Sequence, residues 1–575
     1  MNIRFVLSIA VSALLFVGCF GGGDDKKRVE DRPDVLLIVV DDLGFADLSP
    51  YGSEILTPAV QALADTGVSF SRFHTSSMGS ATRSMLLTGV DNHLNGFGTV
   101  APLHTANQYM KDGYETYLNR DVATIAEVLE AQGYATAMVG KWALGVGAAH
   151  SPKSRGFQRS FALQGSGAHH FASAVALNAV ESEIAFYSEN GVVVDSLPAD
   201  FYSSKFFAEK MSQYIKETPK SKPFFGYLSF TAPRAPLQVE AAWQDRAKGR
   251  YDAGDVAVRQ ARLERQVELG LFPESVLEQR YDSQNVAWQW LSTYGRELEI
   301  RKMEIYAAMV EYLDNSIGQV VEELKRSGRY DNTLIIVMSD NGASAESAVY
   351  YANIEDWQAW VYKNGVDNIG NEDSFVALGS RWVDVCNAPF TLGKATMGQG
   401  GIASPLIISG GAIKSERKMG RMDSGNILHV SDIVPTILDY TESVMLDEFR
   451  GVDIASPEGR SLRGAIERTE IVRQEDEPLC FEMLEGKAVI MGNWKARCLA
   501  PPYGNGRRWE LFDLREDPME RTNLAYSNRE KLNEMVAQWD QYGERVGYIR
   551  AIGTRPYISL IGAKRYFGYD TRLRR

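Results

Sequence analysis

The segment VLLIVVDDLG, residues 35–44, decides the expected fold. Its first six residues are all apolar, as in a parallel strand whose two faces are both buried, whereas a half-exposed strand would alternate with polar residues. The run ends abruptly at Asp41 and Asp42. Because ligands of open α/β sheets bind outside the carboxyl ends of the strands, this segment predicts a central strand and part of a functional site.

Helices and strands are expected to alternate along the chain that follows. Thr57 precedes Pro58 at a first helical position, apolar residues recur at helical spacing, and Gly67 ends the helix. Further helices are expected over 125–132, 206–215 and 303–324, and strands over 68–70, 135–139, 224–230 and 334–338. The pattern predicts an α/β fold with a large, mostly parallel sheet sandwiched by helices.

The sequence also predicts the organisation of the chain into segments. We expect a signal peptide over 1–19, a tether over 20–32, an α/β domain over 33–475 with insertions at 237–300 and 346–390, a smaller C-terminal α+β domain over 476–544, and a basic aromatic tail over 545–575. The 346–390 insertion is rich in Trp and Tyr. These rings either line a substrate mouth or form a satellite core on the main domain, and the second interpretation is favoured.

Composition limits the class of protein. The 575 residues are 45% hydrophobic, enough for a large core, which excludes wholesale disorder. The formal net charge is −13, from 61 Lys+Arg against 74 Asp+Glu, so the chain as a whole repels phosphate backbones. We therefore expect no nucleic-acid partner.

The first residues are typical of export. Arg4 precedes an apolar run over 5–17, which is too short to span a bilayer, and Gly18-Cys19 follows it. This pattern favours a bacterial lipoprotein signal, with a lipid on Cys19 as the only membrane contact and a periplasmic or outer-membrane-anchored location. A plain cleaved secretory signal is the alternative. Cys386, Cys480 and Cys498 do not form a disulfide framework, since three cysteines allow one disulfide at most.

A second pair of polar residues ends another predicted strand. Asp340 and Asn341 follow the apolar run over 334–338, as Asp41 and Asp42 follow the first run. Three carboxylates and one amide suit Ca²⁺, or Mg²⁺, better than Zn²⁺, because His and Cys are absent from the set. The four residues are therefore a predicted metal site.

The stretch from Phe73 to Gly89, FHTSSMGSATRSMLLTG, resembles the signature of the type I sulfatases of the alkaline phosphatase superfamily. Bacterial arylsulfatases are similar at further motifs, namely 41–45 (DDLGF), 140–145 (GKWALG), 339–342 (SDNG), 400–402 (GGI), 492–495 (GNWK) and 511–514 (LFDL). The resemblance runs from about residue 33 to about residue 543. It implies an alkaline-phosphatase/sulfatase-like fold and hydrolysis of sulfuric esters.

The signature departs from the family at the nucleophile. Active members convert a Cys or Ser to formylglycine, and Gly79 occupies that position here, so no formylglycine is expected. Ala81 replaces the signature Pro. The family's two histidines correspond to Ala143 and Arg234, neither of which titrates usefully near neutral pH.

The charged residues of the family site are retained. By resemblance, Asp41, Asp42, Asp340 and Asn341 match the calcium ligands, Arg83 matches the residue that supports the nucleophile, and Lys141 and Lys394 match the lysines that contact sulfate. Three carboxylates balance Arg83, Lys141 and Lys394, so Arg234 leaves the pocket near +1, and a bound divalent cation would leave it near +3. A sulfated or phosphorylated small molecule or glycan is the expected partner.

Three functional hypotheses follow. The favoured one is a degenerate sulfatase that binds Ca²⁺ and an anionic ester and turns the ester over slowly or never. The alternative is an active, metal-dependent sulfate or phosphate ester hydrolase whose nucleophile is water or a hydroxyl such as Ser80 or Ser77. The third is a structural or glycan-holding lipoprotein in which the site that resembles the sulfatase active site has no function.

Overall fold

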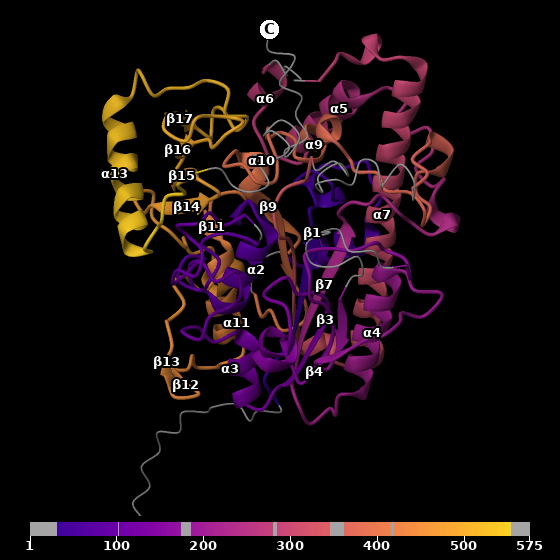
Figure 1. Ribbon diagram of the computed structural model, residues 1–575, viewed down its shortest axis with the longest axis vertical. Coiled ribbons are helices and arrows are strands. Elements are labelled where there is room, and N and C mark those ends of the chain that lie inside the picture. Colours follow the sequence, from indigo (N-terminus) through magenta and orange to yellow (C-terminus); the bar gives the residue numbers. More distant parts are fainter. Residues whose placement is uncertain are drawn as a thin grey trace, which may run out of the picture.

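The computed structural model describes residues 31–101, 103–173, 186–279, 285–345, 362–415 and 419–553. A large twisted sheet with helices on both faces forms the main body, and a smaller unit packs against one side of it (Figure 1). The predicted signal peptide, Cys19, most of the tether and residues 554–575 lie outside the described residues. In the described part, no helix combines the length and apolar character needed to cross a bilayer.

The main sheet has eleven strands in the order β10-β2-β9-β8-β1-β7-β3-β4-β5-β6, with β11 also paired to β2. Their bounds are β1 Asp34–Asp41, β2 Val68–His74, β3 Ala135–Lys141, β4 Arg159–Leu163, β5 Tyr187–Glu189, β6 Val192–Val193, β7 Phe224–Pro233, β8 Thr333–Ser339, β9 Ala403–Ser409, β10 Arg421–Asp423 and β11 Leu428–His429. A separate hairpin joins β12 Glu448–Phe449 and β13 Val452–Asp453.

The centre of the sheet is parallel, as predicted. Strands β8, β1, β7, β3 and β4 run in one direction, whereas β9 is antiparallel to both of its neighbours, β2 and β8. Strand β9 is not predicted from the sequence. Its apolar run contains Pro405, a residue that argues against a central strand, and the tertiary packing overrides that local signal.

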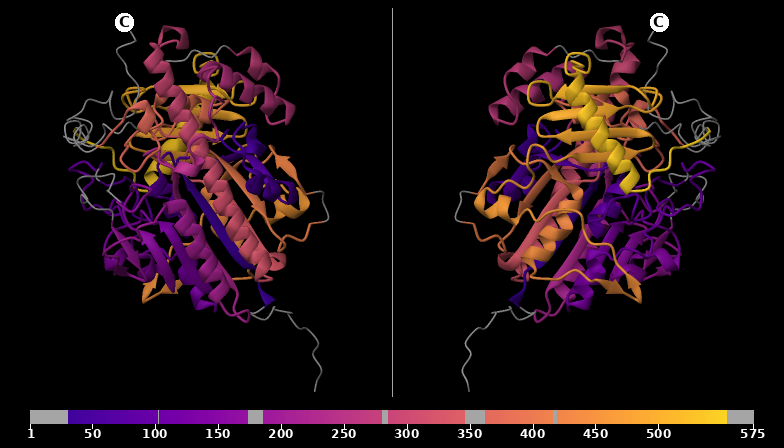
Figure 2. Two further views of the ribbon diagram at one scale, coloured as in Figure 1. Left: turned by 90° about the vertical axis from the view of Figure 1, so that its right-hand side faces the viewer. Right: turned by 90° about the vertical axis from the view of Figure 1, so that its left-hand side faces the viewer.

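Strand β1 is buried on both faces, as its sequence predicts. Leu36 and Ile38 belong to the hydrophobic core on one side of the sheet, and Leu37 and Val39 belong to the core on the other side. Helices α1, α4 and α7 cover the first face, and α2, α3, α11 and α12 cover the second (Figure 2).

The predicted helices are present; α4 and α7 extend beyond their expected ends, whereas α3 ends one residue before its expected end. The bounds are α1 Pro58–Thr66, α2 Gly79–Thr88, α3 Ile125–Ala131, α4 Ser203–Glu217, α5 Asp255–Glu268, α6 Ser275–Glu278, α7 Thr293–Arg326, α9 Ser380–Cys386, α10 Gln399–Ile402, α11 Ile433–Tyr440, α12 Arg463–Arg468 and α13 Arg529–Arg545. Helix α1 begins with Pro58 after Thr57 and stops at Gly67, as the residue pattern indicates. The charged 237–300 region supplies α5 and α6.

The described aromatic residues of the 346–390 region are buried. Trp382 is fully buried, and its ring centroid lies 5.7 Å from that of Tyr251 and 6.4 Å from that of Trp288. Tyr362 is 7% exposed. These contacts favour the satellite-core interpretation for the rings concerned. Four other aromatic residues of the region, Tyr350, Tyr351, Trp357 and Trp360, lie outside the described residues.

The C-terminal unit is a four-stranded antiparallel sheet with one long helix, which confirms the predicted smaller α+β unit. Its strands are β14 Leu479–Met483, β15 Gly486–Met491, β16 Trp494–Cys498 and β17 Trp509–Asp513, and α13 packs on them through Met535 and Trp539. The first residues of the predicted tail lie on the main body, where the Ile549 N–H donates to the Tyr114 hydroxyl at 2.7 Å.

A buried histidine joins the two units. His93, in the loop after α2, contacts Glu482 of β14 through Nε2 at 2.8 Å and Asp91 through Nδ1 at 3.1 Å. The Tyr542 hydroxyl of α13 donates to the same Asp91 at 2.9 Å. Burial alone would lower the pKa of His93, but the hydrogen bonds and charges of Asp91 and Glu482 raise it to about 9.

We expect the charge on His93 to make the stability of the protein pH-dependent. Because the folded pKa is raised, the contribution is complete below the unfolded value of about 6.5 and is lost as the pH rises through about 9. Between these values one proton is held only by the folded state, so the unfolding free energy should fall by about 1.4 kcal/mol per pH unit from this group.

Urea unfolding of wild type and His93→Gln between pH 6 and pH 9.5 measures this contribution. The variant should be less stable by about 3 kcal/mol at pH 6, since Asp91 and Glu482 keep their buried charges without a cation, and the difference should shrink toward pH 9.5. His104→Gln is the matched control, because His104 lies in a loop of the same region and, within the described residues, contacts the ring of Tyr109 and pairs with no carboxylate. A constant difference across this pH range would contradict the assignment.

Candidate active site

Adjacent parallel strands bring the four predicted metal-site residues together. Asp41 ends β1, Asp42 follows it, and Asp340 and Asn341 follow β8, whose Ser339 is in register with Val40 of β1. All four side chains are buried, and one carboxylate oxygen from each aspartate lies within 4.8 Å of the others. Like charges this close in a buried site are unstable unless cations neutralise them.

The amide of Asn341 orients this cluster. Its Nδ2 donates to Asp42 Oδ1 at 2.8 Å, and the Asp42 N–H donates to Asp340 Oδ1 at 3.2 Å. Asn341 Oδ1 is buried and has no hydrogen-bond partner among the described residues. An unsatisfied buried oxygen beside three carboxylates fits a hard divalent cation, so the residue set is compatible with the predicted Ca²⁺ or Mg²⁺.

Four basic side chains from four different segments surround the carboxylates. Lys141, at the end of β3, donates to both oxygens of Asp41 at 2.7 and 2.8 Å. Lys394 donates to Asp42 Oδ2 at 2.9 Å, and Arg234, directly after β7, lies with its Nε 3.4 Å from the same oxygen. Burial and the charges of Arg83 and Arg234 outweigh the attraction of Asp41 and lower the pKa of Lys141 to about 8.

Arg83 on α2 is the most enclosed of the four cations. Its Nε donates to Asp340 Oδ2 at 2.9 Å, and its side chain is fully buried. Although burial disfavours its charge, Asp340, Tyr227 and Asp41 raise its pKa. Arg83 also contacts Ser229 Oγ and the Tyr227 hydroxyl, which fixes the guanidinium between α2 and β7.

Gly79 is the first residue of α2 and faces the carboxylates. A Cβ built on its backbone would lie 2.3 Å from Asp340 Oδ2 and 3.3 Å from Asn341 Oδ1. Its backbone is not in the left-handed region, so the limit on a side chain here is space rather than conformation. The predicted nucleophile position is thus directed at the acidic cluster and carries no reactive group.

Two neighbouring serines differ in their surroundings. Ser77 is buried, and its hydroxyl has no hydrogen-bond partner in the described part of the chain. Ser80, the second residue of α2, is partly exposed. Ala143 follows Lys141 by two residues, is 9% exposed and takes a left-handed backbone conformation with φ 55°. Its methyl side chain can neither donate nor accept a proton.

His170 was not predicted from the sequence. Its Nε2 lies 3.0 Å from the backbone oxygen of Arg234, and its Nδ1 lies 2.8 Å from Ser203 Oγ. Burial lowers its pKa to about 4, so the ring is neutral at physiological pH and holds the Arg234 backbone as a hydrogen-bond partner. No sequence pattern marks this contact, because 64 residues separate the two partners.

Comparison with known proteins agrees with this geometry. The Sulfatase family model matches residues 33–443. An uncharacterized sulfatase of Schizosaccharomyces pombe is 39% identical over 541 residues, covering 92% of this chain and 96% of that protein. The arylsulfatase of Klebsiella aerogenes is 39% identical over 436 residues, covering 76% of this chain and 90% of the enzyme.

Solved structures agree on the fold. The crystal structure of Ps i-CgsB in complex with k-i-k-neocarrahexaose covers 89% of this chain and 92% of its own, with a TM-score of 0.61 at 22% sequence identity. The family match spans the strands of the main sheet, the acidic cluster and the four cations, and it ends before the C-terminal unit. The chain therefore belongs to the sulfatase family.

Proposed function

We propose that this protein binds Ca²⁺ and an anionic ester at the sulfatase site and is impaired in the family's hydrolysis. The observation that carries the proposal is Gly79, which faces the acidic cluster with no side chain while the charged residues around it are all present. Binding of an oxoanion depends on those charges, whereas covalent turnover depends on the group that is missing.

The metal would be held by Asp41, Asp42, Asp340 and the unsatisfied oxygen of Asn341. Ca²⁺ takes six to eight oxygen ligands and tolerates irregular geometry, which suits three carboxylates and an amide. When bound, it would add positive charge beside the ester oxygens. Lys141 neutralises Asp41, and Lys394 neutralises Asp42.

The ester group would be bound by Lys141, Lys394 and Arg234. These cations come from separate segments yet converge on Asp41 and Asp42, so an oxoanion near them meets several positive groups. With Arg83 they exceed the three carboxylates by one positive charge, before any metal is counted. One solved structure of the same fold holds k-i-k-neocarrahexaose, and another holds D-glucosamine-2-N,6-O-disulfate, which supports a sulfated glycan as the class of ligand.

Three side chains that the family uses for ester hydrolysis are replaced in this protein. Gly79 has no β-carbon that an oxidation could convert to an aldehyde. Ala143 holds no proton, and the guanidinium of Arg234 stays protonated, so neither serves as an acid or base near neutral pH. Loss of a covalent nucleophile alone costs about 10⁶-fold in kcat in a well-studied protease.

A hydrolase with another nucleophile is the second candidate function, and one observation favours it. Ser80 is partly exposed at the start of α2, next to Gly79, and no hydrogen bond or ion pair occupies its hydroxyl within the described residues. Its place one residue further along the helix turns its side chain by about 100° from that of Gly79, which is unfavourable for the same attack. The turnover experiment below separates the two candidates.

We predict that Ca²⁺ stabilises the protein through the acidic cluster. Isothermal titration and thermal unfolding should show one Ca²⁺ site in the wild type, weakened at least about tenfold in Asn341→Ala and lost in Asp340→Asn. Asp331→Asn is the matched control, since Asp331 is an exposed acid before the opposite end of β8. Equal Ca²⁺ affinity in wild type and both site variants would exclude this metal site.

We predict binding of aryl esters without turnover. 4-Nitrophenyl sulfate and 4-nitrophenyl phosphate should raise the melting temperature in the presence of Ca²⁺, and hydrolysis should not exceed that of Asp41→Ala. Lys394→Gln should weaken binding about ten- to hundredfold, because it removes a charged hydrogen bond. Lys414→Gln is the control, since Lys414 is exposed beyond the far end of β9. Hydrolysis abolished in Asp41→Ala and in Ser80→Ala would instead establish the second candidate.

A cysteine at position 79 should not restore full sulfatase activity. Gly79→Cys, produced together with a formylglycine-generating enzyme, still lacks the groups replaced by Ala143 and Arg234, and its Cβ requires Asp340 to move. Activity of the triple variant Gly79→Cys, Ala143→His, Arg234→His should exceed that of the single variant on 4-nitrophenyl sulfate. Mass spectrometry of the modified peptide confirms conversion. Efficient hydrolysis by the single variant would show that the remaining site is not remodelled.

A further inference from the structure

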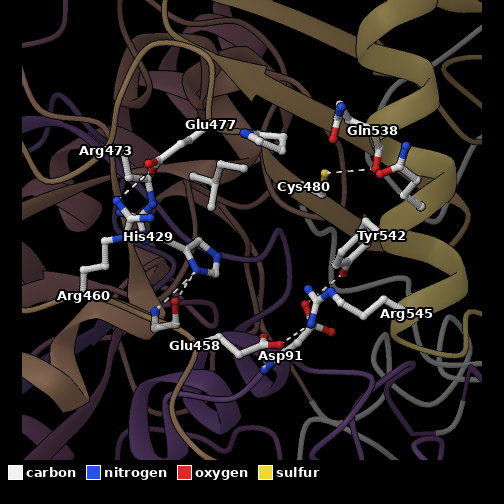
Figure 3. A pocket seen from close by; sticks show the side chains of 14 residues that line it. Asp91, His429, Glu458, Arg460, Arg473, Glu477, Cys480, Gln538, Tyr542 and Arg545 are labelled. Atoms are coloured by element: carbon white, nitrogen blue, oxygen red, sulfur yellow. Dashed lines mark hydrogen bonds and ion pairs between the residues drawn. The ribbon is translucent and has the colours of Figure 1, made fainter.

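A pocket of about 420 Å³ lies between the main domain and the C-terminal unit (Figure 3), and none of the residues of the acidic cluster lines it. On one side it is lined by His429, Arg460 and Arg473, and on the other by Gln538, Tyr542 and Arg545 of α13. Glu477 and Cys480, near the start of β14, close one end, and Asp91 and Glu458 lie at the other. A volume of this size is within the range of small-molecule sites.

The carboxylates of this pocket already have partners. Asp91 accepts from Tyr542 and His93, and Glu458 accepts from the Asp91 N–H at 3.2 Å and pairs with Arg545. Glu477 pairs with Arg460 at 2.7 Å. The acceptor capacity of the walls is therefore largely taken up within the protein.

Hydrogen-bond donors remain in excess. Arg460 Nη1 pairs with Glu477 and donates to the Val472 backbone oxygen. Arg545 Nη1 donates to Glu458. The other guanidinium nitrogens of both residues have no partner in the described part of the chain, and each side chain is about half exposed, at 50% and 53%. Gln538 and Gln541 also line the pocket, and neither side-chain amide has a hydrogen-bond partner among the described residues.

The charge of the lining is balanced. Arg460, Arg473 and Arg545 face three carboxylates, so a multiply charged anion gains little here, in contrast to the cation-rich sulfatase site. Pro478, Leu479 and the Tyr542 ring add an apolar surface. Directed polar groups combined with an apolar strip match a ligand that carries many hydroxyl oxygens on a carbon ring.

We propose that this interdomain pocket is a second ligand site, which binds an uncharged mono- or disaccharide. The guanidinium groups of Arg460 and Arg545 and the amides of Gln538 and Gln541 would donate to sugar oxygens. The apolar strip would receive the C–H face of the ring. The site is distinct from the metal cluster, and the proposal holds whether or not the sulfatase site binds an ester.

The test uses the full chain with Ca²⁺ and five probes: glucose, galactose, N-acetylglucosamine, lactose and cellobiose. Saturation-transfer NMR detects binding, and titration to ~50 mM measures a millimolar Kd. Gln541→Ala is the decisive variant, because the described residues give its side chain no hydrogen bond to lose. Arg460→Gln is the second variant. Asn533→Ala, on the exposed side of α13 outside the pocket, is the matched control. Asp340→Asn tests whether the sugar binds at the acidic cluster instead.

At least one probe should bind the wild type. Its Kd should rise about five- to tenfold in Gln541→Ala and in Arg460→Gln, as expected for one lost donor, and stay unchanged in Asn533→Ala and Asp340→Asn. Absence of binding by all five probes would overturn the proposal. So would a Kd unaffected by Gln541→Ala and Arg460→Gln, loss of binding in Asp340→Asn, or displacement of the sugar by sodium sulfate, which would mark an anion site.

Discussion

The buried carboxylates of Asp41, Asp42 and Asp340 must be neutralised for this fold to form. They lie within 4.8 Å of one another at the ends of β1 and β8, where water cannot screen them. The neutralising cations come from α2, from the ends of β3 and β7, and from the loop before α10. Pairing these segments with the acids fixes the positions of the loops at this edge of the sheet.

The three carboxylates and four cations of the site serve ligand binding, whereas covalent chemistry would need a further group. The charges that would attract an oxoanion also hold the carboxylates in place, so they are needed for folding whatever the reaction. Glycine at position 79 contributes no charge to that balance, whereas a larger residue would displace Asp340, whose Oδ2 lies 2.3 Å from a Cβ built there. The charged groups of the site are therefore all in place with glycine at position 79, and Arg234 adds a permanent positive charge to them.

The C-terminal unit contributes to this frame from outside the main sheet. Lys495 of β16 is fully buried, pairs with Glu520 at 2.8 Å and donates to Gln399 at 3.0 Å. Glu520 in turn accepts from the Gln399 N–H at 2.6 Å. Gln399 opens α10, five residues after Lys394. The GNWK stretch that resembles the family thus supports the segment that carries a site lysine.

Local sequence determined the central strand β1, the start and end of α1, and the residue types at the strand ends. It also determined that position 79 has no β-carbon. These features follow from periodicity and from the chemistry of single residues. Only the tertiary structure decided the place of β9, the support of Arg234 by His170 and the contact of Arg83 with Ser229. Those features depend on which distant strands become neighbours. His170 and Arg234 lie 64 positions apart in the sequence, and Arg83 and Ser229 lie 146 positions apart. No local sequence pattern links residues so far apart, because their hydrogen bonds form only when the fold brings them together.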